Sequence, residues 1–418
     1  MRKSCLFMFI IALASLQARA DEVVKIVSLE KAGTLDAMLG TERSEIDSIV
    51  VSGPMNAADW ESLRSCCMLG RVHGMDLSDV RAENDSMPAK ALGHMSFRSS
   101  LKYLRLPQTL TVIGPMALRW CTSLEHVDLP VSLKRIGYQA FEICTSLRHI
   151  LLPESLEVVS SQAFATTGLE SVVLPGGVKC LGDEVFAACV NMKEAIIPEK
   201  IEDTMGWGTF RGCWALEKVS IPSDTDNIPG SMFEDCEMLS DFQWPSCLQS
   251  IGSSAFEACP MARIVLPEGL RDIGRNAFRY NTSLVSLVLP STLSSVHETV
   301  LIGCGQSLAG VYCQSVMPPM VVAAGSSIER EESLKAIRAV TLYVPKGSSA
   351  AYSTATYWQS FADIVELDIA DFPTAVSYTL LNRKPDARLY GLDGRMMTTP
   401  AKGMVISNGR KYVITKRH

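Results

Sequence analysis

The chain lacks an excess of positive charge and a long apolar run. Its 39 Lys and Arg stand against 45 Asp and Glu, which gives a net charge of −6, whereas a nucleic-acid binder needs a basic face for the phosphates. The longest apolar run, residues 6–16, is about half of the roughly 20 residues that a membrane-spanning helix needs. We therefore expect no nucleic-acid partner and no transmembrane span.

Sequence signatures of catalysis are also missing. The chain has no G-x-S-x-G, P-loop, H-E-x-x-H or dinucleotide-binding motif. Its 13 cysteines include no C-x-x-C pair of the kind that binds metals or exchanges disulfides. We expect a protein that is not an enzyme, with no cofactor and no metal.

The first twenty residues have the features of an export signal. Arg2 and Lys3 precede the apolar run, and Ala18-Arg19-Ala20 supplies small residues for cleavage. We predict a signal peptide over residues 1–20 and a mature chain that begins at Asp21. A membrane anchor is the alternative, for which the run is short. Export leaves the outer surface, the extracellular medium and the periplasm open as destinations.

A regular series of prolines divides most of the chain into units of 22 to 24 residues. These are Pro107, Pro130, Pro153, Pro175, Pro198, Pro222, Pro245, Pro267 and Pro290. Each proline ends a phrase such as residues 124–130, in which Leu124, Val127 and Leu129 are apolar. Apolar residues two apart indicate a short strand with one face buried, and proline ends it because it cannot donate the next hydrogen bond. This strand forms one edge of each predicted coil.

A second phrase follows each proline and is clearest over residues 133–144. Gly137 predicts a turn, after which Ala140, Phe141 and Cys144 fall at helical spacing, so we predict one or two helical turns with one buried face. A unit of this length cannot bury its own apolar face, whereas units stacked about 4.8 Å apart share a continuous core.

The combined phrase L-x-x-[LIV]-x-L-P and S-L-x-x-I-G-x-x-A-F-x-x-C resembles the BspA-type leucine-rich repeats of bacterial surface proteins. With the stacking argument, the resemblance implies an α/β repeat fold, a right-handed leucine-rich-repeat solenoid with a parallel sheet on one face. It would cover residues 21–366, with an irregular N-terminal cap over 21–85 and an inserted loop over 317–338. One unit departs from the pattern at residues 205–209, where we predict a bulge.

The last part of the chain, residues 367–418, breaks the repeat. Asp393-Gly394 and Asn408-Gly409 stand between strand-like runs, as in hairpins, so we predict a small antiparallel β C-terminal module. The segment resembles C-terminal segments of exported Bacteroidetes proteins, some linked to type IX secretion. That resemblance implies a role in export or surface attachment, and an ordinary capping pair of hairpins is the alternative.

Seven cysteines share one position of the repeat. They are Cys121, Cys144, Cys189, Cys213, Cys236, Cys259 and Cys304, and Thr167 and Asn281 take the same position in other units. A position shared by Cys, Thr and Asn predicts a small buried residue that hydrogen-bonds, so we expect reduced thiols. Disulfides among the remaining cysteines stay open.

Alternation assigns the outward residues of each strand, and these are the candidate ligand-binding residues. They are Tyr103, Arg105, His126, Asp128, His149, Leu151, Val173, Glu194, Ile196, Lys218, Asp241, Gln243 and Arg263. His126 and His149 are equivalent positions of neighbouring units, but a zinc site needs three or four ligands, so we interpret them as surface residues. The equivalent positions Ser286 and Val288 are also expected to face outward.

The outward apolar residues Leu151, Val173 and Ile196 have no packing role at solvent-facing positions, which fits a protein-binding face. The competing explanation is that β-branched residues suit strands anywhere. We expect an exported, adhesin-like binding protein, and the resemblance implies a host or matrix protein or glycan as its partner. The alternatives are a structural cell-envelope component without a dedicated ligand and an enzyme with an unrecognised site. The sequence does not give the oligomeric state.

Overall fold

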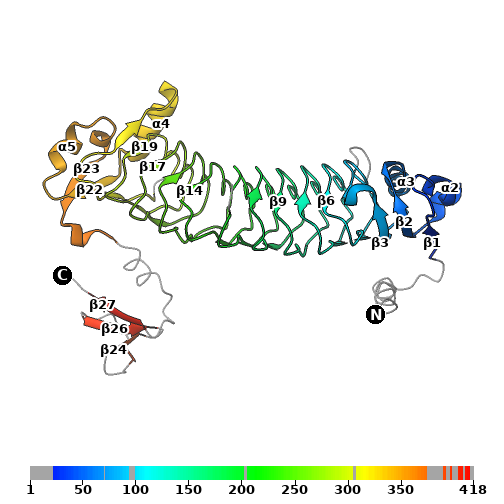
Figure 1. The fold of residues 1–418 in the computed structure, drawn as a ribbon. Helices are drawn as coiled ribbons and strands as arrows, with labels where there is room; N and C mark the ends of the chain where they lie inside the picture. The colour runs from blue at the N-terminus through cyan, green and yellow to red at the C-terminus, as the bar shows by residue number, and fades with distance from the viewer. Residues whose placement is uncertain are drawn as a thin grey trace. The chain divides into compact units, whose positions relative to one another are not determined.

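The computed structural model describes residues 22–69, 71–93, 99–201, 205–304 and 307–373, together with the backbone of four short strands between residues 389 and 414. The chain divides into two compact units, Met1–Glu366 and Leu367–His418. In the first unit the chain winds as a row of stacked coils between an N-terminal and a C-terminal part that carry helices (Figure 1). The predicted signal peptide lies outside the described residues.

One edge of the coils is a ladder of parallel strands, which we call the first ladder. Its repeat strands are β5 (Tyr103–Arg105), β7 (His126–Asp128), β10 (Ser171–Val173), β12 (Glu194–Ile196), β13 (Lys218–Ser220), β16 (Arg263–Val265), β18 (Ser286–Leu289), β20 (Gly310–Cys313), β22 (Thr341–Pro345) and β23 (Asp363–Leu367). Equivalent residues are paired, as in Tyr103 with His126 and Glu194 with Lys218. The predicted sheet of parallel strands is therefore confirmed.

Two coils interrupt the first ladder, at residues 149–151 and 241–243, which are not strands. In the second of these coils Phe242 and Trp244 occupy the inward positions that Val127 and Leu129 occupy in a regular coil. Their rings pack against Phe256 at centroid distances of 5.0 and 5.1 Å. We attribute the second interruption to these larger inward side chains.

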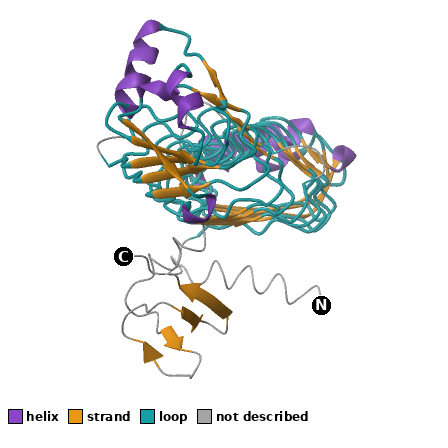
Figure 2. Ribbon diagram, turned by 90° about the vertical axis from the view of Figure 1, so that its left-hand side faces the viewer, coloured by secondary structure: helices purple, strands orange, loops and turns teal. Residues whose placement is uncertain are grey.

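The opposite edge of the coils forms a second ladder of parallel strands, so the prediction of a sheet on one face was incomplete. It contains β4 (Ser86–Met87), β6 (Val112–Ile113), β8 (Arg135–Ile136), β9 (Val158–Val159), β11 (Cys180–Leu181), β14 (Asn227–Ile228), β15 (Ser250–Ile251), β17 (Asp272–Ile273), β19 (Ser295–His297) and β21 (Met320–Val322). Arg135 is exposed and Ile136 is buried, so the side chains of this ladder also alternate between solvent and core. Viewed along the coils, strands lie on two sides of the stack (Figure 2).

The helical turns predicted after each glycine are wrong. Residues 138–143 form consecutive tight turns, with Gln139 at φ 54° and Ile143 at φ 64°, which a right-handed helix cannot contain. Alternate amides donate to the next coil instead of within their own coil, as in Phe141 N–H to the Ala163 carbonyl at 2.8 Å. These bonds between coils offset the cost of the left-handed residues.

Stacked phenylalanines fill the core beneath these turns. The rings of Phe141, Phe164, Phe186, Phe210, Phe233, Phe256 and Phe278 lie in adjacent coils and are fully buried. Phe186 stacks on Phe164 and on Phe210, at a centroid distance of 5.6 Å in each case. The repeated aromatic position therefore joins each coil to both of its neighbours.

The shared cysteine position is buried and hydrogen-bonded, as predicted. The Cys236 thiol donates to the carbonyl of Phe210 in the preceding coil at 3.3 Å, and Cys259 donates to Phe233 at 3.1 Å. Asn281 makes the same contact to Phe256 through Nδ2 at 2.7 Å. All cysteines of the described residues are free thiols, including the five outside this position.

The N-terminal coils differ from the repeat because they carry helices. β1 (Val24–Ser28), β2 (Ser48–Met55) and β3 (Gly74–Ala82) extend the first ladder, with α2 (Leu35–Leu39) and α3 (Ala57–Met68) between them. Asn56 caps α3 in a capping box with Asp59. The Asp59 carboxylate also accepts the amides of Gly33 and Leu35, at 2.7 and 3.0 Å, so one buried acid ties α2 to α3.

The segment 317–338, predicted as an inserted loop, instead contains β21 and an 11-residue helix, α4 (Ser327–Ile337). Gly325 and Ser326 suggested a loop, but Ser326 caps the helix by accepting the amide of Glu329 at 3.2 Å. Glu, Arg, Leu, Lys and Ala then continue it, all of which favour helices.

The C-terminal end of the solenoid closes over aromatic side chains. α5 (Ser349–Thr354) carries Tyr352, which is buried with Trp358 and Phe361. The Trp358 indole N–H donates to the Pro319 carbonyl at 2.9 Å, and Tyr352 Oη donates to that of Ser315 at 2.8 Å. Single 3₁₀ turns occur at Glu42–Glu45, Glu83–Asp85, Trp358–Ser360 and Ile369–Asp371.

The bulge predicted at residues 205–209 is not there. Gly208 has φ +62°, like Gln139 in its coil, and Phe186 N–H donates to the Thr209 carbonyl at 2.9 Å, so this stretch keeps the regular turn. Eight positions lead from Pro198 to Gly206, against seven from Pro130 to Gly137. The extra residue therefore lies before the turn, in a stretch whose residues 202–204 are outside the described residues.

In the second unit the 3₁₀ turn Ile369–Asp371 is followed by the described strands β24 (Leu389–Gly391), β25 (Met396–Met397), β26 (Gly403–Ser407) and β27 (Arg410–Ile414). Neighbouring strands of this sheet pair antiparallel, in the order β25-β24-β26-β27. The two predicted turn dipeptides, Asp393-Gly394 and Asn408-Gly409, lie outside the described residues.

Candidate binding face

The outward side of the first ladder carries an open groove of about 1120 Å³. We call it the ladder groove. β2 and β3 form its wall at the N-terminal end, and Arg105, His126, Asp128, His149 and Leu151 continue it across three coils. The structure therefore brings five of the predicted ligand-binding residues together in one concave surface.

A charge network lies in the groove. The Arg105 guanidinium lies between two carboxylates, with Nη1 3.2 Å from Asp76 Oδ2 and Nε 3.1 Å from Asp128 Oδ2. Asp76 is buried, and its other oxygen accepts the amide of Ser78 at 3.0 Å. Because Asp76 and Asp128 both hold it, the cation is fixed in direction and presents a rigid polar surface.

Asp128 also orders His126. His126 Nε2 lies 2.8 Å from Asp128 Oδ1. This hydrogen bond raises the pKa of His126 above its ordinary value and lowers that of Asp128. His149 is exposed at the equivalent position of the next coil, and no cluster of three His, Cys, Asp or Glu that could hold a metal occurs in the described part of the chain.

An exposed aliphatic stripe extends from the groove along the ladder. Leu151 is 90% exposed, Val173 is 62% exposed and Ile196 is 38% exposed. Val173 and Ile196 are paired neighbours on β10 and β12, and Leu151 also lines the groove. The stripe and the charge network therefore meet at Leu151.

The other predicted residues lie outside the groove. Tyr103 is half-buried and donates from Oη to Glu125 Oε2 at 3.3 Å. Farther along the ladder, exposed side chains continue the face at Glu194, Lys218, Asp241, Gln243 and Arg263.

The predicted outward face ends before β18, because Ser286 and Val288 are buried. Val288 pairs with Tyr312 of β20, whose ring stacks on Tyr343 of β22 at 4.4 Å. We attribute the burial of Ser286 and Val288 to these two large neighbouring side chains.

Asp76 is one of the groove residues that the sequence reasoning missed. Gly74 pairs with Tyr103 and Asp76 pairs with Arg105, so Asp76 occupies the same outward position as Arg105 one coil earlier. Residues 72–78 resemble a repeat strand phrase, but they lie within the segment 21–85 that is predicted as an irregular cap.

The fold and this outward face define a repeat solenoid. The family described as BspA type leucine rich repeat region matches residues 90–207 and 203–317, in six copies. The chain therefore belongs to the BspA-type leucine-rich-repeat family. No curated protein matches the chain at a significant level.

The chain is similar to solved bacterial structures, of which the first below supports the fold. A leucine-rich repeat protein from Bacteroides ovatus is 22% identical over 67% of this chain and 75% of its own, with a TM-score of 0.54. The pneumococcal vaccine antigen PcpA is 16% identical over 77% of this chain and 80% of its own, with a TM-score of 0.43.

Among the described residues, no helix is both long enough and apolar enough to cross a bilayer.

Proposed function

We propose that this chain is an exported binding protein that holds a protein or glycan partner on the outward face of its first ladder. The observation that supports the proposal is the exposed stripe of Leu151, Val173 and Ile196 beside the ladder groove. Contiguous apolar surface next to ordered charges is typical of protein interfaces, where aliphatic groups supply the affinity and charges fix the register.

The partner that suits this face is a folded protein, with a glycan as the second class. The aliphatic stripe matches an apolar patch on a protein, and Arg105 and the two carboxylates beside it match polar groups at its rim. Membership of a family of bacterial surface repeats supports a host or matrix protein as the source. Fold alone does not assign a partner, so the face carries the proposal.

Export is part of the proposal. Residues 1–20 would direct the chain out of the cytoplasm, and residues 367–418 would form a small antiparallel module that assists secretion or surface attachment. Deleting residues 367–418 tests the second role. Loss of surface exposure with retained export across the inner membrane would support it, and unchanged surface exposure would contradict it.

The binding face is tested with two triple variants of the mature chain, residues 21–418. The first changes Leu151, Val173 and Ile196 to Asp. The matched control changes Val131, Val190 and Met238 to Asp, which are 80%, 37% and 52% exposed and do not line the groove. Both variants are first checked for native folding by circular dichroism and thermal unfolding.

Biolayer interferometry then measures binding to a panel of purified extracellular-matrix proteins and mucin-type glycans. We expect at least one partner whose affinity falls at least about tenfold in the first variant and changes little in the control. If no panel member binds, or if both variants bind like the native chain, the face is not a binding surface. A structural role in the cell envelope then becomes the better proposal.

A further inference from the structure

The two ladders end at different places. The first ladder continues through β20 and β22 to β23, whereas β21 is the last strand of the second ladder in the described part of the chain. Beyond β21 the chain forms α4 and the C-terminal closing segment. The second ladder therefore ends in an edge strand whose far side has no strand partner among the described residues.

The hydrogen bonds of β21 show which groups face that side. Met320 N–H donates to the Ser294 carbonyl at 2.9 Å, and Glu298 N–H donates to the Val322 carbonyl at 2.9 Å, so residues 320 and 322 bond toward β19. In a parallel ladder alternate residues bond the same neighbour, so the amide and carbonyl of Val321 point the other way. An extended chain could pair with them.

A cavity of about 310 Å³ lies beside this edge. Met320 and Val321 both line it, and consecutive strand residues face opposite sides of a sheet, so the cavity touches the strand at its edge. Ala355, Thr356 and Trp358 of the closing segment line the other side. The space where another strand of the second ladder would lie is therefore open.

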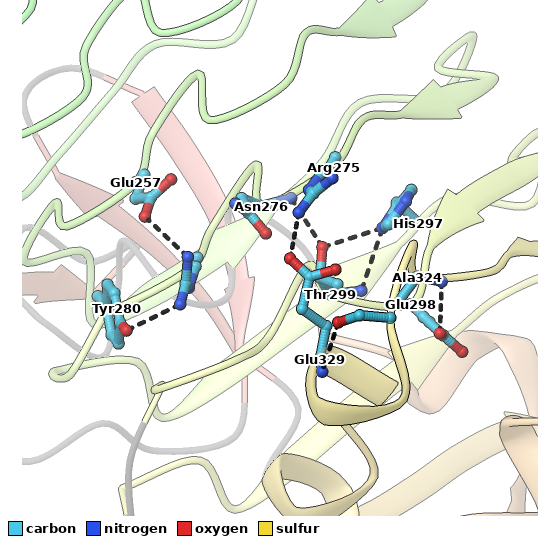
Figure 3. A network of polar contacts seen from close by, with 11 residues as sticks. Glu257, Arg275, Asn276, Tyr280, His297, Glu298, Thr299, Ala324 and Glu329 are labelled. Atoms are coloured by element: carbon cyan, nitrogen blue, oxygen red, sulfur yellow. Dashed lines mark hydrogen bonds and ion pairs between the residues drawn. The ribbon is translucent and has the colours of Figure 1, made fainter. Parts of the chain in front are cut away.

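Two charged side chains also line the cavity. Glu298 is 4% exposed, and its carboxylate accepts the amide of Ala324 at 2.5 Å (Figure 3). Among the described residues no basic side chain forms an ion pair with Glu298, and no acid forms one with the exposed Arg330. A buried carboxylate without a cation attracts a basic group, and Arg330 attracts an acidic one.

The first turn of α4 is held against the second ladder by an ion pair. Arg275, which follows β17, pairs with Glu329, so the helix that carries Arg330 is tied to the coil of β17 (Figure 3). Exposed apolar side chains occur on β21 and close to it in the sequence: Met317 is 67% exposed, Met320 65% and Ile328 72%. These side chains offer apolar contacts to a strand that docks beside them.

We propose that this edge binds an extended peptide segment of a partner protein, which pairs with Val321 as a further strand of the second ladder. The peptide carries a basic side chain for Glu298 and an acidic one for Arg330, with aliphatic residues between them. Backbone hydrogen bonds supply affinity and the two charges supply selectivity. The site is separate from the ladder groove and does not depend on it.

The test measures fluorescence anisotropy of the labelled probe peptide acetyl-Thr-Val-Lys-Val-Glu-Val-Thr-amide with the mature chain. Val321→Pro removes the outward amide and leaves the bonds of residues 320 and 322, and Val321→Ala keeps that amide as a matched control. We expect affinity to fall about tenfold in Val321→Pro and less than about threefold in Val321→Ala. Glu298→Gln should lower the affinity for this probe. It should leave unchanged the affinity for a second probe in which Thr replaces Lys.

A second arm leaves the protein unchanged, in case Val321→Pro does not fold. Probe peptides N-methylated at alternate residues lose the donors of one edge, and methylation of one of the two alternating sets should abolish binding. Absence of probe binding to the native chain, or equal binding of both methylated sets and the parent, would overturn the proposal. Concentration-dependent dimerisation that Val321→Pro abolishes would assign the edge to a second copy and also overturn it.

Discussion

The inward positions of the coils and the outward face of the first ladder follow opposite rules. Phe186 has a phenylalanine on either side of it in the stack, and Cys236 has a cysteine on either side. The outward position varies along the ladder, from Tyr103 through His126 and His149 to Glu194. Positions that stack must repeat, because each coil packs on a copy of itself. Positions that do not stack are free to vary, and there a partner can be recognised.

Replacing a stacked ring should have the largest effect. Phe186→Ala leaves a cavity between the rings of Phe164 and Phe210, and we expect a loss of about 3–5 kcal/mol in the free energy of unfolding. Urea denaturation monitored by circular dichroism measures it. Leu151→Ala is the control at an outward position and should change stability by less than about 0.5 kcal/mol. Equal losses for both would end the distinction between the two kinds of position.

A smaller loss is expected where backbones of adjacent coils approach closely. A Cβ at Gly206 would lie 1.9 Å from the Gly182 carbonyl oxygen, so Gly206→Ala forces the coils apart and should cost about 1–3 kcal/mol. A Cβ at Gly176 would have no other atom within 4 Å. Gly176→Ala should therefore be neutral or stabilise the fold by up to about 1 kcal/mol. Thermal unfolding of the two variants compares them directly, and a similar change in both would contradict close coil contact at Gly206.

The cysteine position should contribute less per residue. Cys236→Ala removes the hydrogen bond to the Phe210 carbonyl and some core volume, so we expect a loss of about 1–2 kcal/mol in the free energy of unfolding, with Cys236→Ser as the control that keeps a donor.

Burial raises the pKa of Cys189 to about 11 and that of Cys304 to about 12. Alkylation at pH 8 with mass spectrometry should therefore label exposed Cys247 first. Rapid labelling of Cys189 in the folded chain would show that the core is open.

The outward face should give the smallest effect on stability. The bond to Asp128 raises the pKa of His126, so its stabilisation is complete below the unfolded pKa near 6.5 and is lost as the pH rises through the folded value. His126 is 60% exposed, so less than about 0.5 kcal/mol is involved. A nuclear magnetic resonance titration measures the pKa of His126, and Asp128→Asn should lower that pKa. An unchanged pKa in that variant would show that the bond does not form in solution.

The first ladder and the cysteine position could be predicted because they depend on local rules. Val127 lies between two outward polar residues, so the alternation of polar and apolar side chains is clear, and proline marks the end of each strand. The second ladder was missed because a strand of two residues, such as Arg135–Ile136, is too short for alternation to show. The turns were mistaken for helix because side-chain spacing alone does not reveal left-handed residues such as Ile143. Their stability comes from hydrogen bonds to the next coil, which no local pattern records.

The groove and α4 were harder to predict because each depends on contacts between distant segments. Asp76 and Asp128 are far apart in the chain, and they meet because both flank Arg105. Residues 317–338 are predicted as a loop and contain Pro318-Pro319, yet the cap at Ser326 and the contact of Arg275 with Glu329 support a helix after these prolines. The outward residues were predicted correctly as far as Arg263 but not at Ser286 and Val288, and the grouping into a groove required the N-terminal coils.

The tight turns also bear on how such a chain can change its length. Each turn donates its alternate amides to the following coil, as Phe141 does to Ala163 and Phe164 does to Val185. A whole coil can therefore be duplicated or deleted by recombination, because its two neighbours present identical bonding partners to each other. A partial coil leaves those amides unmatched. The length of the outward face can thus evolve in steps of about 23 residues without a new core.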